Sequence, residues 1–220
     1  KDAIETARNA DAVVMVMGGS SARDFSSEYE ETGAAKVTIN QISDMESGEG
    51  YDRATLHLMG RQLELLEEIS RLGKPVVLVL IKGRPLLMEG AIQEAEAIVD
   101  AWYPGMQGGN AVADVLFGDY NPAGRLTLSV PRSVVQLPVY YNTRRKGNRS
   151  RYIEEPGTPR YPFGYGLSYT TFSYTDMKVQ VTEGSDDCRV DVTVTIQNQG
   201  TADGDEVAQL YFQDDVSSFT

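Results

Sequence analysis

Two short, uninterrupted runs of apolar residues constrain the fold of this chain most strongly. Residues 12–17 (AVVMVM) precede Gly18-Gly19, and residues 75–81 (PVVLVLI) form the second run. Runs of this length are typical of strands that are covered on both faces of a sheet. Between them, apolar residues recur at helical spacing before Gly73: Met59, Leu63, Leu66 and Ile69. The order strand, helix, strand therefore predicts an α/β fold.

The same alternation continues along the next part of the chain. Its pattern predicts a helix over 86–95, a strand over 97–102, a short helix over 111–117 that ends at Gly118, and a strand over 125–130. Apolar strands that alternate with helices are typical of a mostly parallel sheet with helices on both faces. We expect a flavodoxin-like layered domain over residues 1–143.

From residue 173 onward the hydrophobic pattern changes to a period of two. Polar residues alternate there with Val190, Val192, Val194 and Ile196. A further strand is expected over 207–212. This pattern is typical of an antiparallel sandwich, which needs about seven strands. We therefore expect that the chain ends inside a domain at 173–220, with open strand edges and an apolar face that either stay disordered or recruit another copy.

A basic and aromatic connector, residues 144–172, separates the two predicted domains. It begins with Arg144-Arg145-Lys146 and includes the turn-rich segment 161–166 (YPFGYG). The basic run could contact phosphate or nucleic acid, or it could be a solvated linker that faces an acidic neighbour. We favour the linker because the chain is acidic, with 20 Lys and Arg against 32 Asp and Glu and a formal net charge of −12.

The composition argues against several classes of function. The acidic balance opposes binding to nucleic acid or to anionic membranes, and no apolar run approaches the roughly 20 residues that a membrane helix needs. The single cysteine, Cys188, is interpreted as a strand residue and cannot form an internal disulfide. The single histidine, His57, cannot build a zinc site with thiolate or imidazole partners. We expect no metal, no cofactor, no nucleic acid and no membrane partner.

The segment that follows Gly18 is the place to look for chemistry. Ligands of open α/β sheets bind beyond the carboxyl ends of the strands, and this segment runs to Arg53 without a clear helix. Its acidic residues are Glu28, Glu30, Glu31, Asp44, Glu46, Glu49 and Asp52. Glu49 lies between Gly48 and Gly50, which leave the backbone free to present its carboxyl group outward. A partly dry cleft would raise the pKa of that group, as a general acid requires.

Asp52 and Arg53 are candidate supporting residues for Glu49. The arginine could anchor the loop through a two-pronged pairing with a carboxylate. The competing interpretation is a solvated acidic loop whose glycines only make turns, and spacing alone favours this second interpretation.

Three other features carry weaker signals. The segment 18–21 (GGSS) lacks the remaining elements of a nucleotide-binding motif and is interpreted as a tight turn. His57 is interpreted as a structural histidine. Trp102 could be a sugar-stacking ring or a tryptophan of the core or of a domain interface.

Five segments together resemble the second and third domains of family 3 glycoside hydrolases, the β-glucosidase and β-xylosidase family. They are 47–53 (SGEGYDR), 73–77 (GKPVV), 101–105 (AWYPG) with Gly108-Gly109, 113–126 (ADVLFGDYNPAGRL) and 161–169 (YPFGYGLSY). The resemblance implies a layered α/β domain followed by a fibronectin type III-like sandwich, both placed after a TIM-like barrel that this chain lacks. One departure is Met106-Gln107, where the family often has an acidic residue before the paired glycines.

The resemblance also implies a division of the catalytic groups. The barrel contributes an aspartate nucleophile, and the α/β domain contributes the acid/base glutamate. The matching residue is Glu49, whereas Glu46 and Glu28 are less suitable because neither has the Asp-Arg spacing. A retaining mechanism needs two carboxyl groups about 5–5.5 Å apart, so the chain alone is expected to be inactive.

The function implied is therefore the C-terminal part of a retaining, exo-acting β-glycosidase that hydrolyses terminal β-linked glucose or xylose. Its expected partners are a β-glucoside or β-xyloside oligosaccharide and the barrel of the same protein. The resemblance also implies a periplasmic or secreted location. The alternative is a non-catalytic module that binds carbohydrate or serves as a scaffold.

Overall fold

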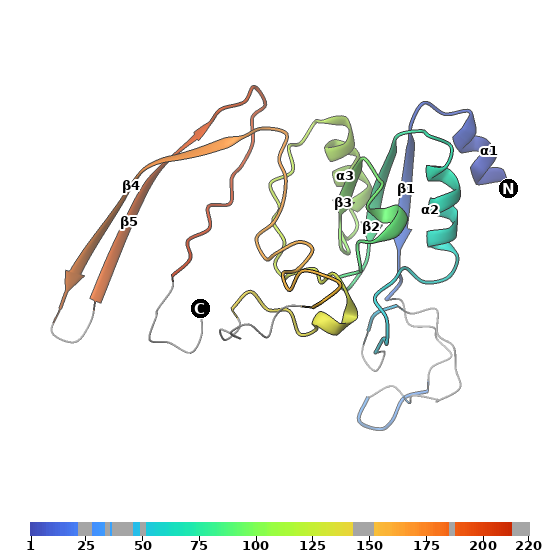
Figure 1. The fold of residues 1–220 in the computed structure, drawn as a ribbon, viewed down its shortest axis with the longest axis horizontal. Coiled ribbons are helices and arrows are strands. Elements are labelled where there is room, and N and C mark those ends of the chain that lie inside the picture. The colour runs from blue at the N-terminus through green and yellow to red at the C-terminus, as the bar shows by residue number, and fades with distance from the viewer. Residues whose placement is uncertain are drawn as a thin grey trace.

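The computed structural model describes residues 1–21, 28–33, 36, 46–48, 52–142, 152–184 and 188–212. It contains a three-stranded parallel sheet in the N-terminal half and a separate two-stranded antiparallel sheet towards the C-terminus (Figure 1). The predicted class, an α/β layer followed by an antiparallel β unit, is confirmed.

The parallel sheet has the order β1 (Val13–Gly18), β2 (Val76–Ile81) and β3 (Ala97–Asp100), with β2 in the centre. These strands arise from the apolar runs predicted at 12–17, 75–81 and 97–102. Gly18 pairs with Ile81, and Leu80 pairs with Asp100. Because all three strands run in one direction, their carboxyl ends meet at the same edge of the sheet.

Two helices cover one face of this sheet. Leu66 and Ile69 of α2 (Gln62–Ser70) and Ala7 of α1 (Asp2–Arg8) are buried in one apolar cluster with Met15, Met17, Leu78 and Leu80. Burial of a single leucine stabilises such a core by about 1.5–3 kcal/mol. The described part of the chain holds no helix long and apolar enough to cross a bilayer.

The third helix, α3 (Gly108–Phe117), lies beside β3 and away from α1 and α2 (Figure 1). It ends at Gly118, whose φ of 83° is the left-handed conformation that favours glycine. The predicted helix over 111–117 with this end is confirmed, although it begins three residues earlier.

Three predicted elements are wrong. Instead of a helix over 86–95 the chain has only the short 3₁₀ turn η1 (Gly90–Ile92). The apolar residues before it enter the core from an extended segment whose Leu87 N–H donates to the carbonyl oxygen of Leu56 at 2.9 Å. Their spacing therefore reflects burial and not helical turns.

The predicted strand over 125–130 is reduced to an isolated bridge between Val130 and Tyr161. Leu126 and Val130 bond to the carbonyl oxygens of Tyr165 and Tyr161 at 2.8 Å each, so this segment pairs with the aromatic connector and not with the parallel sheet. The predicted strand over 207–212 is absent as well, because no ladder forms over these residues.

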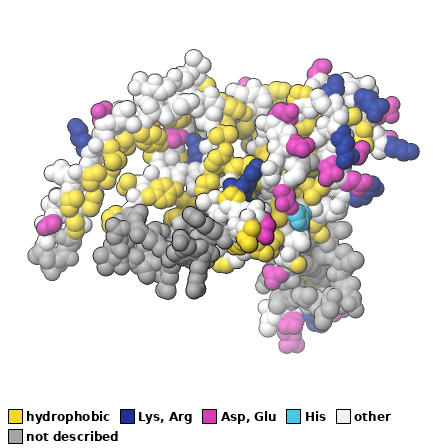
Figure 2. Space-filling view, viewed as in Figure 1, with side chains coloured by type: hydrophobic (Ala, Val, Ile, Leu, Met, Phe, Trp, Pro, Cys, Tyr) yellow, Lys and Arg dark blue, Asp and Glu magenta, His cyan; other side chains and the backbone are white. Residues whose placement is uncertain are grey.

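The C-terminal unit is a hairpin of β4 (Phe172–Glu183) and β5 (Cys188–Asn198) with a bulge between Thr175 and Lys178. Cys188 is the first residue of β5, which confirms the prediction of a strand residue, and the structure shows it to be exposed. Apolar side chains run along the hairpin in Figure 2. Five that are more than a third exposed are Met177, Val179, Val181, Val190 and Ile196. Self-association through this surface stays a prediction.

Polar contacts join the segments just before and just after the hairpin to residues 121–125. Asn121 donates to the carbonyl oxygen of Asp203 at 3.0 Å and accepts from the Ser168 hydroxyl at 2.8 Å. Nearby, Arg125 pairs with Glu206 at 2.8 Å, and both side chains are largely buried. The motif at 121–125 (NPAGR) therefore binds the chain on both sides of the hairpin.

A substitution of Gly18 tests how closely the backbones of β1 and β2 approach each other at the end of β1. Its φ is +142°, and a Cβ atom there would lie 1.7 Å from the carbonyl oxygen of Ile81. Gly18→Ala should lower the free energy of unfolding by roughly 3 kcal/mol or more, because both strain and overlap must be relieved. Gly109→Ala is the matched control, since nothing lies within 4 Å of its Cβ position in α3. The control should raise stability by about 0.5–1 kcal/mol. Urea denaturation measures both, and equal effects of the two substitutions would contradict the prediction.

Candidate functional site

The candidate site lies at the carboxyl ends of the three parallel strands. The chain after β1, the chain after β2 and the chain after β3 converge there on residues 46–48. The Glu46 N–H donates to the carbonyl oxygen of Ser20 at 2.8 Å, which fixes this segment beside the end of β1. A hollow of about 320 Å³ opens at the same strand end and is lined by residues 16–20, Gln62 and Ile81.

Glu46 is a buried carboxylate at the base of the acidic loop. Its residue is only 1% exposed, and its Oε1 accepts a hydrogen bond from Nη1 of Arg53 in an ion pair. The other terminal nitrogen of Arg53 donates to the carbonyl oxygen of His57 at 2.6 Å. A Cβ atom on Gly19 would lie 1.4 Å from Oε2 of Glu46, so the carboxylate needs glycine at this position. The two ends of segment 46–53 are therefore tied together.

Lys82 is a buried cation at the end of the central strand. Its side chain is 0% exposed, and Nζ lies 2.9 Å from Oδ2 of Asp100. Nζ also lies 3.8 Å from the centroid of the Trp102 ring, which is the geometry of a cation–π contact. Burial lowers the pKa of Lys82, while the charges of Asp100 and Glu46 and the hydrogen bond to Asp100 oppose that shift. The ammonium thus contacts the Asp100 carboxylate and an aromatic face, and the negative charge of Glu46 acts on it as well.

Trp102 and Tyr103 connect the end of β3 to Gly19 and to segment 46–48. Trp102 has a φ of 52°, a left-handed conformation that is unusual for a bulky residue. The Tyr103 hydroxyl donates to the carbonyl oxygen of Gly19 at 3.1 Å and lies 2.8 Å from the Ser47 hydroxyl. Because the tyrosine has one proton, Ser47 donates to Tyr103 in this arrangement. The turn after β3 thereby bonds directly to the segment that carries Glu46.

The predicted site residues differ in exposure and in contacts, and one of them is not described. Glu49 lies outside the described residues. Asp52 is exposed, whereas the Arg53 side chain is only 12% exposed. Arg53 does contact a carboxylate, but with one nitrogen on Glu46 and the other on a backbone carbonyl. Glu28 is an exposed residue that pairs with Lys36 at 3.3 Å.

The other candidates have structural contacts. Nδ1 of His57 lies 3.1 Å from a carboxylate oxygen of Glu89, and both side chains are half exposed. The Trp102 ring is covered on one face by Lys82. Within the residues that the structure describes, no three His, Cys, Asp or Glu side chains are placed to hold a metal ion.

Sequence reasoning missed Lys82 and Asp100. A signal was present, because each residue directly follows or ends an apolar strand, and neighbouring parallel strands bring such residues to one edge. Tyr103 was missed as a contact of residues 46–48. These residues could have been predicted to lie together only if the order of the strands in the sheet had been known.

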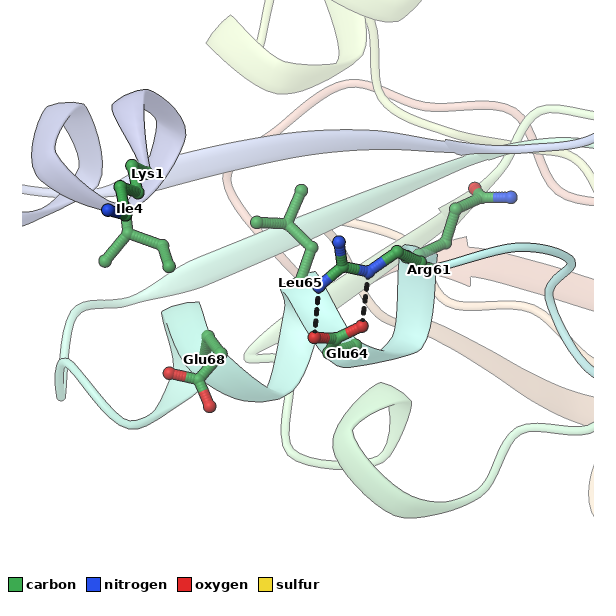
Figure 3. Close-up of a pocket in the computed structure, with 7 residues that line it drawn as sticks. Lys1, Ile4, Arg61, Glu64, Leu65 and Glu68 are labelled. Carbon is green, nitrogen blue, oxygen red and sulfur yellow. Dashed lines mark hydrogen bonds and ion pairs between the residues drawn. The ribbon is translucent and has the colours of Figure 1, made fainter.

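A second hollow, of about 420 Å³, lies between α1 and α2. Figure 3 shows that Arg61 and Glu64 on its rim are directed at each other, with two hydrogen bonds of 2.7 and 2.5 Å. Both side chains are mostly exposed. Arg61 and Glu64 pair with each other, so neither of them offers an unpaired charge to a ligand in this hollow.

Comparison with known proteins identifies the family. The sequence model described as the glycosyl hydrolase family 3 C-terminal domain matches residues 1–169. The chain belongs to glycoside hydrolase family 3. A β-xylosidase of Formosa agariphila is 42% identical over 99% of the chain, and a periplasmic β-glucosidase of Salmonella typhimurium is 40% identical over 100% of it. The chain covers 27% of the length of each of these family 3 relatives.

Solved structures of β-glucosidases have the same fold. That of the Erythrobacter marinus enzyme matches 90% of the chain with a TM-score of 0.72 and 38% identity, and the chain covers 24% of it. The Listeria innocua enzyme in complex with isofagomine matches 92% of the chain with a TM-score of 0.71 and 32% identity, and the chain covers 27% of it. The expected family and its glycosidase relatives are thereby confirmed.

The lowered pKa of Lys82 predicts a pH dependence of stability. Between this lowered pKa and the unfolded value of about 10.4, the unfolded chain binds a proton that the folded chain has lost. The free energy of unfolding of the natural protein should therefore rise with pH in this window, relative to that of Lys82→Met. Urea denaturation at a series of pH values below about 10.4 measures the difference.

The matched control for this pH series is Leu78→Ala, which removes a fully buried side chain of the same strand without changing a titratable group. Its loss of stability relative to the natural protein should be the same at every pH. A Lys82→Met variant that behaves like this control would contradict the assigned burial of the ammonium.

Proposed function

We propose that this chain is the C-terminal part of a retaining, exo-acting β-glycosidase that hydrolyses terminal β-linked glucose or xylose. Membership of glycoside hydrolase family 3 and relatives named β-xylosidase and β-glucosidase support the proposal. The substrate would be a β-glucoside or β-xyloside oligosaccharide. The remaining catalytic group would come from a barrel domain of the longer protein.

The observation that carries the proposal is the ion pair between Glu46 and Arg53. It joins two residues that flank Glu49 in the sequence and fixes them at the carboxyl edge of the parallel sheet. Open α/β sheets bind ligands beyond this edge. A segment anchored in this way is suited to deliver a carboxyl group to a docked barrel.

In the proposed reaction Glu49 has two successive roles. In the first step its carboxyl group protonates the glycosidic oxygen while the barrel aspartate attacks the anomeric carbon, so that the glycosidic bond breaks, the protonated aglycone leaves and a glycosyl-enzyme forms. In the second step the Glu49 carboxylate removes a proton from water, which displaces the aspartate and releases the sugar. Asp52 and Arg53 support the loop, the arginine through Glu46. The reaction uses two carboxyl groups and needs no cofactor.

The proposal includes a division of the chain and a location. Residues 1–143 would form the layered domain, 144–172 the connector, and 173–220 would belong to a fibronectin type III-like domain. The Salmonella typhimurium relative is named a periplasmic β-glucosidase, which supports a periplasmic or secreted protein.

Glu49→Ala in the full-length enzyme tests the acid/base role. The value of kcat/KM for a phenyl β-glycoside, which needs protonation of its leaving group, should fall roughly 10²–10⁴-fold. The value for a dinitrophenyl β-glycoside should change little, but its kcat should fall because water is no longer activated. Azide should restore kcat and yield a glycosyl azide.

The matched control for Glu49→Ala is Glu28→Ala, since Glu28 is exposed and pairs only with Lys36 among the described contacts. It should retain the rates of the natural enzyme on both substrates. Absence of a glycosyl azide product with Glu49→Ala would contradict the assignment.

The isolated 220-residue chain should not hydrolyse an aryl β-glucoside or β-xyloside, because one of the two carboxyl groups is on the barrel. Product release measured against a reaction without protein checks this. Turnover by the purified chain would contradict the division of catalytic groups. Tight binding of sugars to the chain alone would favour the alternative function, a carbohydrate-binding or scaffolding module.

A further inference from the structure

Four buried or largely buried charges form one cluster at the carboxyl edge of the parallel sheet. Two are cations and two are carboxylates: Lys82, Arg53, Glu46 and Asp100. We refer to them as the buried charge cluster. Breaking a buried pair leaves an uncompensated charge, so such a cluster holds its members in one arrangement more firmly than exposed pairs do.

Lys82 connects to the loop by two routes. The first is electrostatic, since the negative charge of Glu46 acts on the Lys82 ammonium. The second runs through the turn after β3. The Lys82 N–H donates to the carbonyl oxygen of Trp102 at 3.2 Å while its ammonium covers the Trp102 ring. These contacts hold Trp102 in its left-handed conformation and direct the next residue towards the loop.

That next residue, Tyr103, completes the second route. Its hydroxyl contacts Ser47 and the carbonyl oxygen of Gly19, so it braces the loop against the end of β1. A Cβ atom on Gly83 would lie 2.4 Å from Oγ of Ser47 and 2.6 Å from the Tyr103 ring, which shows how closely these groups pack. Both routes from Lys82 therefore end on adjacent residues, Glu46 and Ser47.

We propose that Lys82 is a positioning residue for the acid/base loop, which it holds through Glu46 and through the Trp102-Tyr103 turn. This inference rests on the proposed role of Glu49, which follows Ser47 by two residues. Lys82 does not touch substrate in this proposal. It fixes the base of the loop, so that the carboxyl group of Glu49 meets the glycosidic oxygen at a set distance.

The test uses the full-length enzyme with Lys82→Met, which keeps an unbranched side chain only one atom shorter and removes its charge. Loss of positioning should lower kcat/KM for a phenyl β-glycoside roughly 10–100-fold. The value for a dinitrophenyl β-glycoside should fall less than about threefold, because this leaving group needs little protonation. Azide should raise kcat on the dinitrophenyl substrate.

Lys74→Met is the matched control, since Lys74 precedes the amino end of the same strand that Lys82 follows. It should retain the natural rates on both substrates. Lys82→Arg, which preserves the positive charge, should recover part of the lost activity on the phenyl substrate.

A purely structural role would lower the rates on both substrates by the same factor, because only the amount of folded enzyme changes. An equal loss on both, or no loss, would overturn the inference. If Lys82→Met does not fold, Lys82→Met with Asp100→Asn removes both members of the ion pair and is judged by the same ratio. If that double variant does not fold either, Glu46→Gln provides the ratio.

Glu49→Ala in the same assays separates the two hypotheses. If Glu49→Ala shows the dependence on leaving group and the Lys82 variants do not, the positioning role is wrong and the proposed function stands. If Glu49→Ala itself lacks that dependence, the acid/base assignment is wrong, and the positioning inference is overturned with it.

Discussion

The burial of the Lys82 ammonium at the end of the central strand is the constraint on which the rest of the site depends. Removing a charge from water costs several kcal/mol unless partners compensate. Asp100 and the Trp102 ring supply that compensation directly, and Glu46 adds a second negative charge. Asp100 and Trp102 lie at the end of β3, and Glu46 lies on the chain after β1. Lys82 itself follows β2, so one cation organises the chain at the ends of all three strands. Arg53 pairs with Glu46, so the same group of charges also fixes the C-terminal end of segment 46–53.

The order of strands and helices in the layered domain could be predicted because apolar runs and helix ends are local signals. The strands at 12–17 and 75–81 need only their own sequence to be recognised. The segment 86–95 misled the prediction because its apolar residues fill the core without turning as a helix. The segment 125–130 misled it because its bonding partner, the aromatic connector, lies more than thirty residues away.

Less of the candidate site could be predicted than of the fold. Glu49 and Arg53 stood out through a motif that resembles a family, whereas spacing alone favoured a solvated loop. The structure shows Glu46 of this segment fully covered, which no local pattern of acidic residues indicates. The burial of Glu46 depends on Gly19 and Arg53, and the buried charge cluster as a whole depends on Lys82. The cluster therefore forms only when segments distant in the sequence come together.

Gln62, the first residue of α2, has a consequence for how the sheet can grow. Its side chain donates to the carbonyl oxygen of Gly18 and accepts from the N–H of Gly18, both at 2.8 Å. These backbone groups face away from β2, because the next residue, Gly19, is the one that bonds to Ile81. The glutamine therefore occupies the last rung of the outer edge of β1. A strand that paired with this edge would have to end before Gly18. The hollow at the carboxyl end of β1 would then stay open.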